Sequence, residues 1–428
     1  MKISIIGTGY VGLVTGACFA ELGNEVVCVD IDESRVRRIN SGVPPIYEKN
    51  LEPMLKRNVR EGRLRATADL EEAVNAADIS FISVGTPSGV LDYIDLKYVE
   101  KVSGDIGKIL KNKNSYHLVV VKSTVLPGTT EYSVLPLLEK NSEKRAGSGF
   151  GVAMNPEFLR EGNAVEDFMH PERIVIGSID EKSTKILLEL YKDFKCPVIT
   201  TNPKTAEMIK YATNSFLVTK ISFINEIGNI CKLLGIDAYE VARGLGMDSR
   251  IGEKFLNAGV GFGGSCFSKD VKALVGKAKE VYYRPIILSA ALEVNEAQPL
   301  RSVELLEKKA GSLSGTDIAV LGLAFKPGTD DMREAPSIKI IRALLKKGAR
   351  VHATDPKAIN EAKKIFGKHE RLLYYDSADE AVKRARYVLI VTEWGEFRRK
   401  ELYKDKVVID GRRIEEARVA NEYEGLCW

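Results

Sequence analysis

The sequence has few of the residues that build metal clusters or disulfide frameworks. Its 428 residues include six cysteines and four histidines. The cysteines, at positions 18, 28, 196, 231, 266 and 427, show no CxxC spacing, and the histidines are equally dispersed. This pattern favours free thiols in a reducing compartment, so it predicts a cytoplasmic location and no metal site.

Long hydrophobic runs and a large charge excess are also absent. No apolar run approaches the roughly 18 residues that a membrane-spanning helix requires. The formal net charge of +4 is small for this length, which argues against a nucleic-acid partner. The sequence therefore predicts a globular protein of two or three domains that engages neither a membrane nor nucleic acid.

The order of apolar patterns predicts the fold class. The first 200 residues alternate strand-like runs with amphipathic segments, a pattern typical of βαβ units and a parallel sheet. From about 204 to 235, apolar residues recur at helical spacing and predict one long helix. Further helical segments reach about residue 310, after which the strand–helix alternation returns. We predict an α/β protein with two Rossmann-like doubly wound domains, joined by a long central helix and a helical middle domain. The predicted boundaries are 1–200, 201–310 and 311–428.

A glycine motif at the start of the chain indicates a dinucleotide site. "GTGYVG" supplies Gly7, Gly9 and Gly12 between a strand and a helical run, and the next strand ends in Asp30. Such glycines admit a pyrophosphate to a helix N-terminus, and the carboxylate binds a ribose hydroxyl. An acid at this position favours NAD, because it would repel a 2′-phosphate. Arg35 complicates this interpretation, since it also falls near the expected adenine ribose.

The second α/β half lacks that motif and carries cations instead. Lys326 and Arg333 lie within "KPGTDDMRE", which follows one strand, and Arg412 follows another strand in "IDGRR". Cations at strand ends suggest a different anionic ligand. Solvated surface charge is the simpler interpretation of each of them alone.

Polar residues at other strand ends are candidates for catalysis. Glu157 and Glu161 lie in "NPEFLREG", and Thr124 lies in "KSTV". Lys210 and Asn214 are four residues apart and share one face of the long helix. Alternatively, Glu157 and Glu161 are acidic residues that simply favour a helix N-terminus. Lys210 could likewise be a solvated surface lysine.

A cysteine follows a glycine-rich stretch. "NAGVGFGGSCFSKD" places Cys266 before a predicted helix, with Ser268 as its N-cap and Asp270 in its first turn. A helix N-terminus and the neighbouring Lys269 both favour a thiolate. A buried inert cysteine is the alternative, but the surrounding glycines argue against it.

In combination, these motifs resemble the UDP-glucose/GDP-mannose dehydrogenase family over essentially the whole chain. They are "GTGYVG", "VGTP", "KSTV", "NPEFLREG", "GVGFGGSCFSKD", "GLAFKPGTDDMRE" and "DGRR". "PERIVIG" and "SCFSKD" are more similar to the branch that oxidises UDP-glucose. The resemblance implies a four-electron oxidation of UDP-glucose by two NAD+ and water, giving UDP-glucuronate. A dehydrogenase with an activated thiol suits this chemistry, because a thiolate adds to the intermediate aldehyde before the second hydride leaves.

The resemblance also implies roles for individual residues. It makes Cys266 the nucleophile, Glu157 the base of the final hydrolysis, Thr124 and Asp270 holders of the water, and Lys210 and Asn214 stabilisers of charge on the reacting oxygen. It assigns NAD contacts to Gly7, Gly9, Tyr10, Val11, Gly12, Asp30, Arg35, Thr86, Thr124, Glu161 and Arg333. It assigns the UDP-sugar to Glu157, Phe158, Leu159, Arg160, Glu161, Lys210, Asn214, Arg250, Phe255, Leu256, Asn257, Ala258, Gly259, Gly263, Lys326 and Arg412, with Arg250 reaching a neighbouring subunit's site.

Three alternatives stay open at this point. A GDP-mannose 6-dehydrogenase would share the chemistry and differ in base recognition. A one-step 2-hydroxyacid-type dehydrogenase also uses a Lys-x-x-x-Asn pair, but it does not need Cys266. An NAD-sensing scaffold would tolerate loss of the catalytic residues, which are all present. The loop "GTPSGVLDYIDLKYV" departs from the family's pattern, and the long helix predicts a homodimer or higher homo-oligomer.

Overall fold

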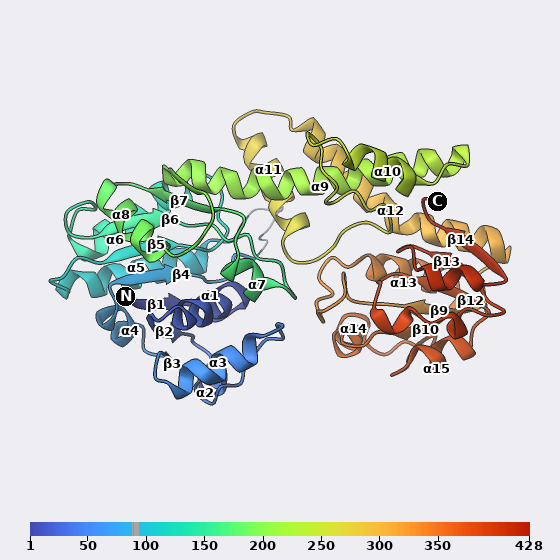
Figure 1. Ribbon diagram of the computed structural model, residues 1–428, viewed down its shortest axis with the longest axis horizontal. Coiled ribbons are helices and arrows are strands. Elements are labelled where there is room, and N and C mark those ends of the chain that lie inside the picture. Colours follow the sequence, from blue (N-terminus) through green and yellow to red (C-terminus); the bar gives the residue numbers. More distant parts are fainter. Residues whose placement is uncertain (88, 90–93) are drawn as a thin grey trace. The chain divides into compact units, whose positions relative to one another are not determined.

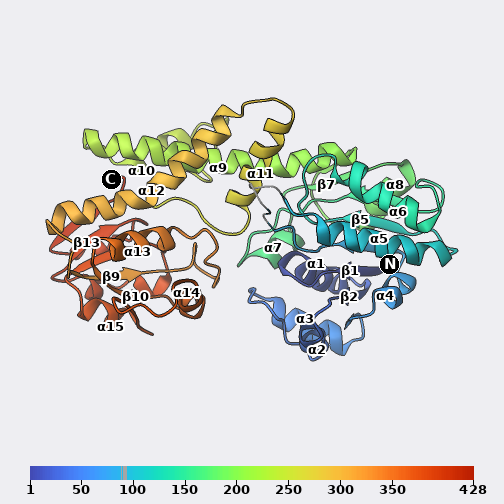
Figure 2. The same ribbon diagram turned by 180° about the vertical axis from the view of Figure 1, so that it is seen from behind.

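The computed structural model describes residues 1–87, 89 and 94–428, so part of the loop after "VGTP" lies outside the described residues. The chain divides into two compact units, Met1–Ala212 and Thr213–Trp428. Each unit contains one twisted sheet with helices on both faces (Figures 1 and 2). The predicted α/β fold with two Rossmann-like sheets is confirmed.

The first sheet has eight strands in the order β3-β2-β1-β4-β5-β6-β7-β8. All neighbours pair in parallel except β6 and β7, which are antiparallel. The central strands β4, β5 and β6 are buried on both faces because helices cover both sides. Their bounds are β1 Lys2–Ile6, β2 Glu25–Val29, β3 Leu64–Thr67, β4 Ile79–Ile82, β5 Leu118–Val121, β6 Gly151–Met154, β7 Ile174–Ser178 and β8 Val198–Thr201.

The helices of the first unit form one buried core on each face of this sheet. One core joins the sheet to α1, α3, α7 and α8, and the other joins it to α4, α5 and α6. Asp32, Asp69 and Asp180 begin α2, α4 and α8 by accepting backbone N–H bonds in the first turn. The bounds are α1 Tyr10–Glu21, α2 Glu33–Asn40, α3 Leu51–Arg60, α4 Leu70–Ala76, α5 Lys97–Asn112, a π-helical turn η2 Thr130–Val134, α6 Leu135–Ser142, α7 Ala164–Met169 and α8 Glu181–Leu190.

The predicted long helix is present as α9, Pro203–Leu234. It begins in the first unit and ends in the second. In the second unit, Ser222 on α9 donates a hydrogen bond of 2.7 Å to the Ala291 carbonyl oxygen on α12. Among the described residues, no helix is both long and apolar enough to span a bilayer.

The second sheet has six parallel strands in the order β11-β10-β9-β12-β13-β14. One core joins it to α9, α10, α12, α13 and α14, and a second core lies on its other face with α15. The strands are β9 Asp317–Leu321, β10 Arg350–Thr354, β11 Leu372–Tyr374, β12 Tyr387–Ile390, β13 Val407–Asp410 and β14 Glu422–Gly425. The helices are α10 Ala238–Gly246, α11 Phe267–Glu280, α12 Ile286–Ala310, α13 Pro336–Lys346, α14 Ile359–Phe366, α15 Ala378–Lys383 and the short η3 Gly395–Phe397, η4 Lys400–Leu402 and η5 Glu415–Val419.

A buried histidine makes the stability of the first unit depend on pH. The Nδ1 atom of His117 lies 3.1 Å from the Ala77 carbonyl oxygen and its Nε2 lies 2.7 Å from the Ser80 hydroxyl. Nδ1 must therefore carry the proton and Nε2 must accept from Ser80. Burial lowers the pKa of His117 to about 3, because the charged ring would lose its hydration.

We expect this histidine to destabilise the fold in acid. Between pH 6.5 and 3 the unfolded chain binds a proton at His117 that the folded chain does not, so stability falls as pH is lowered, by about 1.4 kcal/mol per pH unit. Thermal unfolding of wild type and His117→Asn across this range checks the effect. The variant should lose part of the pH dependence, whereas His170→Asn, at an exposed histidine, should keep it.

Candidate functional site

The glycine motif forms the turn between β1 and α1. A Cβ at Gly12 would lie 1.9 Å from the Gly7 carbonyl oxygen, and one at Gly7 would lie 2.7 Å from the Ser83 carbonyl oxygen. A Cβ at Gly9 would meet nothing of the described chain within 4 Å. Gly9 is the N-cap of α1, whose first residues, Tyr10 and Val11, are uncharged. Open space before such a helix N-terminus suits a pyrophosphate.

Asp30 follows β2 and lies beside this turn. Its Oδ2 accepts hydrogen bonds from the Thr8 backbone N–H, at 3.1 Å, and from the Thr8 hydroxyl. Its Oδ1 accepts from the Asp32 backbone N–H at 3.0 Å. Arg35 Nη1 lies 3.7 Å from Asp30 Oδ2. The carboxylate is thus fixed at the strand end, and Arg35 lies against it.

Glu157 follows β6 and forms a buried ion pair. Its Oε1 lies 2.8 Å from Lys210 Nζ on α9, and both side chains are almost fully buried. Its Oε2 accepts the Leu159 backbone N–H at 2.6 Å. Burial alone would raise the pKa of Glu157, but Lys210, the Leu159 N–H and the ammonium of Lys122 hold that pKa below its usual range. Glu157 is therefore ionised at neutral pH.

Two predicted threonines meet at the ends of neighbouring strands. Thr86 follows β4 and Thr124 follows β5, two strands that pair in parallel. The Thr86 hydroxyl donates a 3.0 Å hydrogen bond to the Thr124 carbonyl oxygen. Both residues lie at the same edge of the sheet as Asp30 and Glu157, where parallel strands collect ligand contacts.

The residues after Glu157 form a packed turn. The Phe158 ring centroid lies 5.5 Å from Lys210 Nζ and 4.1 Å from the guanidinium of Arg173. Arg160 makes a two-pronged contact with Asp167, at 3.0 Å from Nε and 2.6 Å from Nη2. Asp167 thus orients the Arg160 side chain, which stays 61% exposed, and Glu161 follows it half-buried.

Cys266 is the N-cap of α11 and is exposed. The helix begins two residues earlier than the sequence pattern predicted, so the choice of Ser268 as N-cap was wrong. The reason is local: the Asp270 backbone N–H donates to the Cys266 carbonyl oxygen at 2.9 Å. The Ser265 hydroxyl lies 3.5 Å from the Cys266 sulfur. The thiol therefore stands at the positive end of α11, which favours its thiolate.

Asp270 is buried one turn after the cysteine. Asn214 Nδ2 on α9 donates to its Oδ2 at 2.7 Å. Lys269 Nζ lies 2.7 Å from its Oδ1. The structure thus brings Asn214, Asp270 and Cys266 together within the second unit, whereas Lys210 and Glu157 belong to the first.

The glycine-rich loop packs directly on the carboxyl edge of the second sheet. A Cβ at Gly259 would lie 2.5 Å from the Gly411 carbonyl oxygen, and one at Gly263 would lie 2.6 Å from the Glu334 carbonyl oxygen. Phe255 starts the loop with φ +67°. Leu256 and Ala258 point into the core and Asn257 is exposed.

Three amides from α9 and α12 hold this loop. Asn225 Oδ1 accepts the Gly259 N–H at 2.8 Å, and Gln298 Nε2 donates to the Gly259 carbonyl oxygen at 2.8 Å. Asn295 accepts the Phe262 N–H at 2.8 Å and donates to the Phe262 carbonyl oxygen at 3.1 Å. The loop is therefore held at both the N–H and the carbonyl group of Gly259.

Arg412 and Lys326 lie at the same edge of the second sheet. Arg412 Nε donates to the Val391 carbonyl oxygen at 2.7 Å and lies 3.2 Å from Glu393. Its Nη2 lies 3.5 Å from the Phe325 carbonyl oxygen. Lys326 Nζ lies 5.3 Å from the Phe325 ring.

Two further predicted cations are exposed and paired locally. Arg333 Nη2 lies 2.7 Å from Asp331, and its carbonyl oxygen accepts the Gly264 N–H at 2.8 Å. Arg250 Nη2 lies 2.6 Å from Asp248, with 87% of its side chain exposed. Arg333 belongs to the second unit, unlike the other residues assigned to NAD.

Sequence reasoning missed three buried charged residues of these edges. Lys122 follows β5 and is only 4% exposed. Asp355 follows β10 and accepts the Leu323 N–H at 2.7 Å. Glu48 accepts the Gly162 N–H at 2.7 Å from 114 residues away. A charged residue directly after an apolar run signals the first two, but no local pattern signals Glu48.

Comparison with known proteins gives the family. Residues 1–195 match the NAD binding domain of the UDP-glucose/GDP-mannose dehydrogenase family, 204–297 match its central domain and 319–417 match its UDP binding domain. The chain belongs to the UDP-glucose/GDP-mannose dehydrogenase family. It is therefore an NAD-dependent enzyme.

Relatives of this family match the chain at nearly full length. The chain is 49% identical to UDP-glucose 6-dehydrogenase TuaD of Bacillus subtilis, over 96% of this chain and 89% of that protein. It is 45% identical to UDP-glucose 6-dehydrogenase AglM of Haloferax volcanii over the full length of both. A solved UDP-glucose dehydrogenase from the hyperthermophilic archaeon Pyrobaculum islandicum superposes with a TM-score of 0.95 at 44% identity, covering 100% of this chain and 97% of that chain.

The residues of the first unit fit NAD. The open face of Gly9 and the close packing of Gly7 and Gly12 leave backbone accessible at the start of α1. Asp30 offers a fixed carboxylate to a ribose hydroxyl and an unfavourable neighbour to a 2′-phosphate. Within the described residues, no group of three or more His, Cys, Asp and Glu side chains could hold a metal ion.

The position of Asp30 predicts the cofactor preference. We expect NAD+ to be preferred over NADP+ by more than about tenfold in kcat/KM, the size of one unfavourable charge contact. Asp30→Ala should narrow that ratio, because the repulsion disappears. Steady-state kinetics with both cofactors checks it, and Asp32→Ala serves as the matched control. Equal use of the two cofactors by wild type would contradict this role of Asp30.

Proposed function

We propose that the protein oxidises UDP-glucose to UDP-glucuronate, using two NAD+ and one water and forming a covalent intermediate on Cys266. The observation that carries this proposal is the exposed Cys266 at the N-cap of α11, directly after a glycine-rich loop. The near full-length similarity to relatives named UDP-glucose 6-dehydrogenase supports UDP-glucose as the substrate.

The thiol explains how one enzyme performs two oxidations. The first converts the C6 alcohol to an aldehyde, in which the C6 hydride passes to a bound NAD+ and the hydroxyl proton is released to solvent. An aldehyde has no further hydride to give until a nucleophile adds to its carbonyl carbon. The Cys266 thiolate forms that bond and gives a thiohemiacetal, whose C–H then supplies the second hydride and leaves a thioester. NAD+ held at the turn of Gly7, Gly9 and Gly12 and beside Asp30 would supply the hydride acceptor for each oxidation.

Hydrolysis of the thioester requires a base and a held water. We assign the base to Glu157, whose carboxylate is ionised at neutral pH and can take the proton of the attacking water. Thr124 and Asp270 are the proposed holders of that water. Collapse of the tetrahedral adduct expels the Cys266 thiolate, and release of the proton from Glu157 to solvent returns the enzyme to its starting state. Lys210 and Asn214 are proposed to stabilise negative charge on the C6 oxygen.

Substrate recognition is assigned to the glycine-rich loop and the cations beside it. The loop backbone, fixed by Asn225 and Gln298, offers N–H and carbonyl groups to a sugar and a uracil. Lys326 and Arg412 offer positive charge to a diphosphate. We further propose Phe158–Glu161 as sugar contacts, Arg333 as an NAD contact and Arg250 as a contact to a neighbouring subunit's site.

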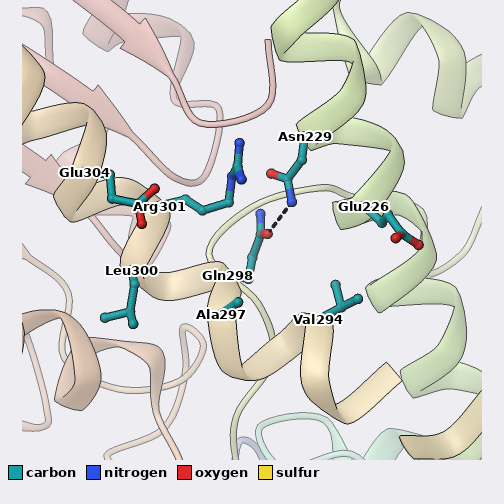
Figure 3. A pocket seen from close by; sticks show the side chains of 8 residues that line it. All are labelled: Glu226, Asn229, Val294, Ala297, Gln298, Leu300, Arg301 and Glu304. Atoms are coloured by element: carbon teal, nitrogen blue, oxygen red, sulfur yellow. Dashed lines mark hydrogen bonds between the residues drawn. The ribbon is translucent and has the colours of Figure 1, made fainter. Parts of the chain in front are cut away.

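We also propose a homodimer formed through the helical middle domain. Phe216, Phe223 and Ile230 recur every seven residues on α9 and are 65%, 48% and 49% exposed. Seven-residue spacing puts them on one face. A cavity of about 260 Å³ also lies between α9 and α12 (Figure 3). Its lining mixes acidic Glu226 with basic Arg301, and such mixed charge suits the self-complementary contact of a two-fold dimer.

We also propose a division into three domains and a cytoplasmic location. The division into domains 1–200, 201–310 and 311–428 follows the sequence pattern. A cytoplasmic location is supported by the six cysteines, all of which are free thiols.

The thioester mechanism predicts distinct phenotypes for three variants. Cys266→Ala should abolish UDP-glucuronate formation, because no covalent adduct can form. Cys266→Ser should be severely slowed, since a hydroxyl adds less readily than a thiolate. Glu157→Gln should retain the thiol but lose the base of hydrolysis and accumulate a UDP-glucuronyl thioester. Intact-protein mass spectrometry after mixing with UDP-glucose and NAD+ detects that adduct.

Separate controls test the role of the cysteine and the identity of the substrate. Cys196→Ser removes a thiol of the first unit and should leave the adduct unchanged. Two NADH released per UDP-glucose, and little NADH from GDP-mannose, would support the assigned substrate. A Cys266→Ala variant that still released two NADH per sugar at a near wild-type rate would exclude the covalent role of the cysteine.

The apolar stripe predicts the effect of charge on assembly. Phe223→Glu combined with Ile230→Glu should convert the dimer to a monomer, because four carboxylates would be buried in a two-fold contact. Leu188→Glu, at an exposed apolar residue of α8, should leave the dimer intact. Sedimentation velocity at micromolar concentration measures both. A monomeric wild type would show that the stripe has another use.

A further inference from the structure

A third buried charge lies beside the Glu157–Lys210 pair. Lys122 follows β5 and is 4% exposed. Its Nζ donates to Asn155 Oδ1 at 2.9 Å and approaches the Asn155 carbonyl oxygen at 3.4 Å. Asn155 stands two residues before Glu157 in the same turn. The ammonium is therefore attached to the backbone that carries the proposed base.

Asn155 does not need a charged donor. Its Oδ1 also accepts the Tyr191 hydroxyl at 2.6 Å, and its Nδ2 donates to the Val175 carbonyl oxygen at 2.8 Å. Its backbone N–H donates to the Val121 carbonyl oxygen at 2.9 Å. The turn is thus held by neutral contacts from three elements. A lysine placed here adds the cost of burying a charge, which a neutral side chain would avoid.

The charges around Glu157 come from two sides. Lys210 Nζ contacts it from α9 at 2.8 Å, and Lys122, just after β5, is held on Asn155, two residues before Glu157 in the chain. Tyr191, after α8, is directed to Asn155, and Arg173, before β7, lies over the Phe158 ring. Two ammonium groups thus accompany one carboxylate in this buried cluster.

We propose that Lys122 is a positioning residue whose buried ammonium keeps the Glu157 carboxylate ionised until it takes the proton of the attacking water. This inference rests on the proposed role of Glu157 as the base. Lys210 is also assigned to the C6 oxygen, so its charge is shared with the substrate. Lys122 supplies a second positive charge that is anchored on Asn155 and independent of that contact.

The titration of Lys122 itself agrees with this geometry. Burial lowers the pKa of Lys122 to about 8, with Glu157 opposing the shift and Lys210 adding to it. Below that pH the ammonium is present and acts on Glu157. Removing it should raise the pKa of Glu157, because a carboxylate loses a neighbouring opposite charge.

The test compares Lys122→Met with Tyr191→Phe. Both remove one hydrogen bond to Asn155 Oδ1, but only the first removes a charge. Lys122→Met should move the acid limb of the kcat–pH profile upward by about one pH unit, the lower end of the effect of a neighbouring charge. Tyr191→Phe should leave that limb in place. Equal shifts in the two variants, or no shift in either, would overturn the proposal.

A direct titration separates this inference from the proposed function. Isotope-edited infrared spectroscopy of protein with labelled glutamate reports the carboxylate, and Glu157→Gln identifies its band. Wild-type Glu157 should titrate below pH 4.5, and in Lys122→Met it should titrate about one pH unit higher. This result holds even if the enzyme does not oxidise UDP-glucose.

Lys122→Gln provides a second neutral variant that can still donate to Asn155. It should shift the titration as Lys122→Met does. If both neutral variants fail to fold, the wild-type titration decides alone: a Glu157 pKa at or above 4.5 would overturn the proposal.

Discussion

An ion pair of 2.8 Å between Lys210 and Glu157 fixes the long helix against the first sheet. A buried charge is tolerated only where an opposite charge or several hydrogen bonds compensate it. That requirement ties the turn after β6 to the first third of α9, and it orients the turn so that the Leu159 N–H also meets the carboxylate. The functional edge of the first unit is therefore built around a charge that the interior must keep satisfied.

Both sheets place polar residues at the carboxyl ends of their parallel strands. Parallel strands end at one edge, and the residue after a strand is the first that is free to be polar. In the first unit these residues include Asp30, Thr124 and Glu157; in the second they include Lys326 and Arg412. The first edge has a glycine turn that exposes a helix N-terminus, whereas the second is closed by the loop that leads to Cys266. One topology thus provides a dinucleotide-compatible edge in the first unit and an edge carrying Lys326 and Arg412 in the second.

Periodicity and motif spacing were sufficient to predict the two sheets, the long helix and most polar residues of their edges. Those features depend on local patterns: apolar runs, helical repeats and glycines at fixed spacing. The start of α11 was missed by two residues because Cys266, rather than a residue with a strong side-chain acceptor, accepts the first helical bond through its carbonyl group. Glu48 and the amides that hold the glycine-rich loop could not be predicted, since their partners lie far away in the sequence.

The boundary between the two units falls inside α9, between Lys210 and Asn214. One helical turn therefore carries Lys210 of the first unit and Asn214 of the second, the two residues proposed to stabilise charge on the C6 oxygen. An α-helix advances by about 1.5 Å and turns by about 100° per residue, so the helix sets the angular phase between these two side chains. A single-residue insertion at this point would leave the contacts within each unit available, yet it would turn Asn214 away from the direction of Lys210. The spacing of four residues within α9 is thus what keeps Lys210 and Asn214 on one face of the helix.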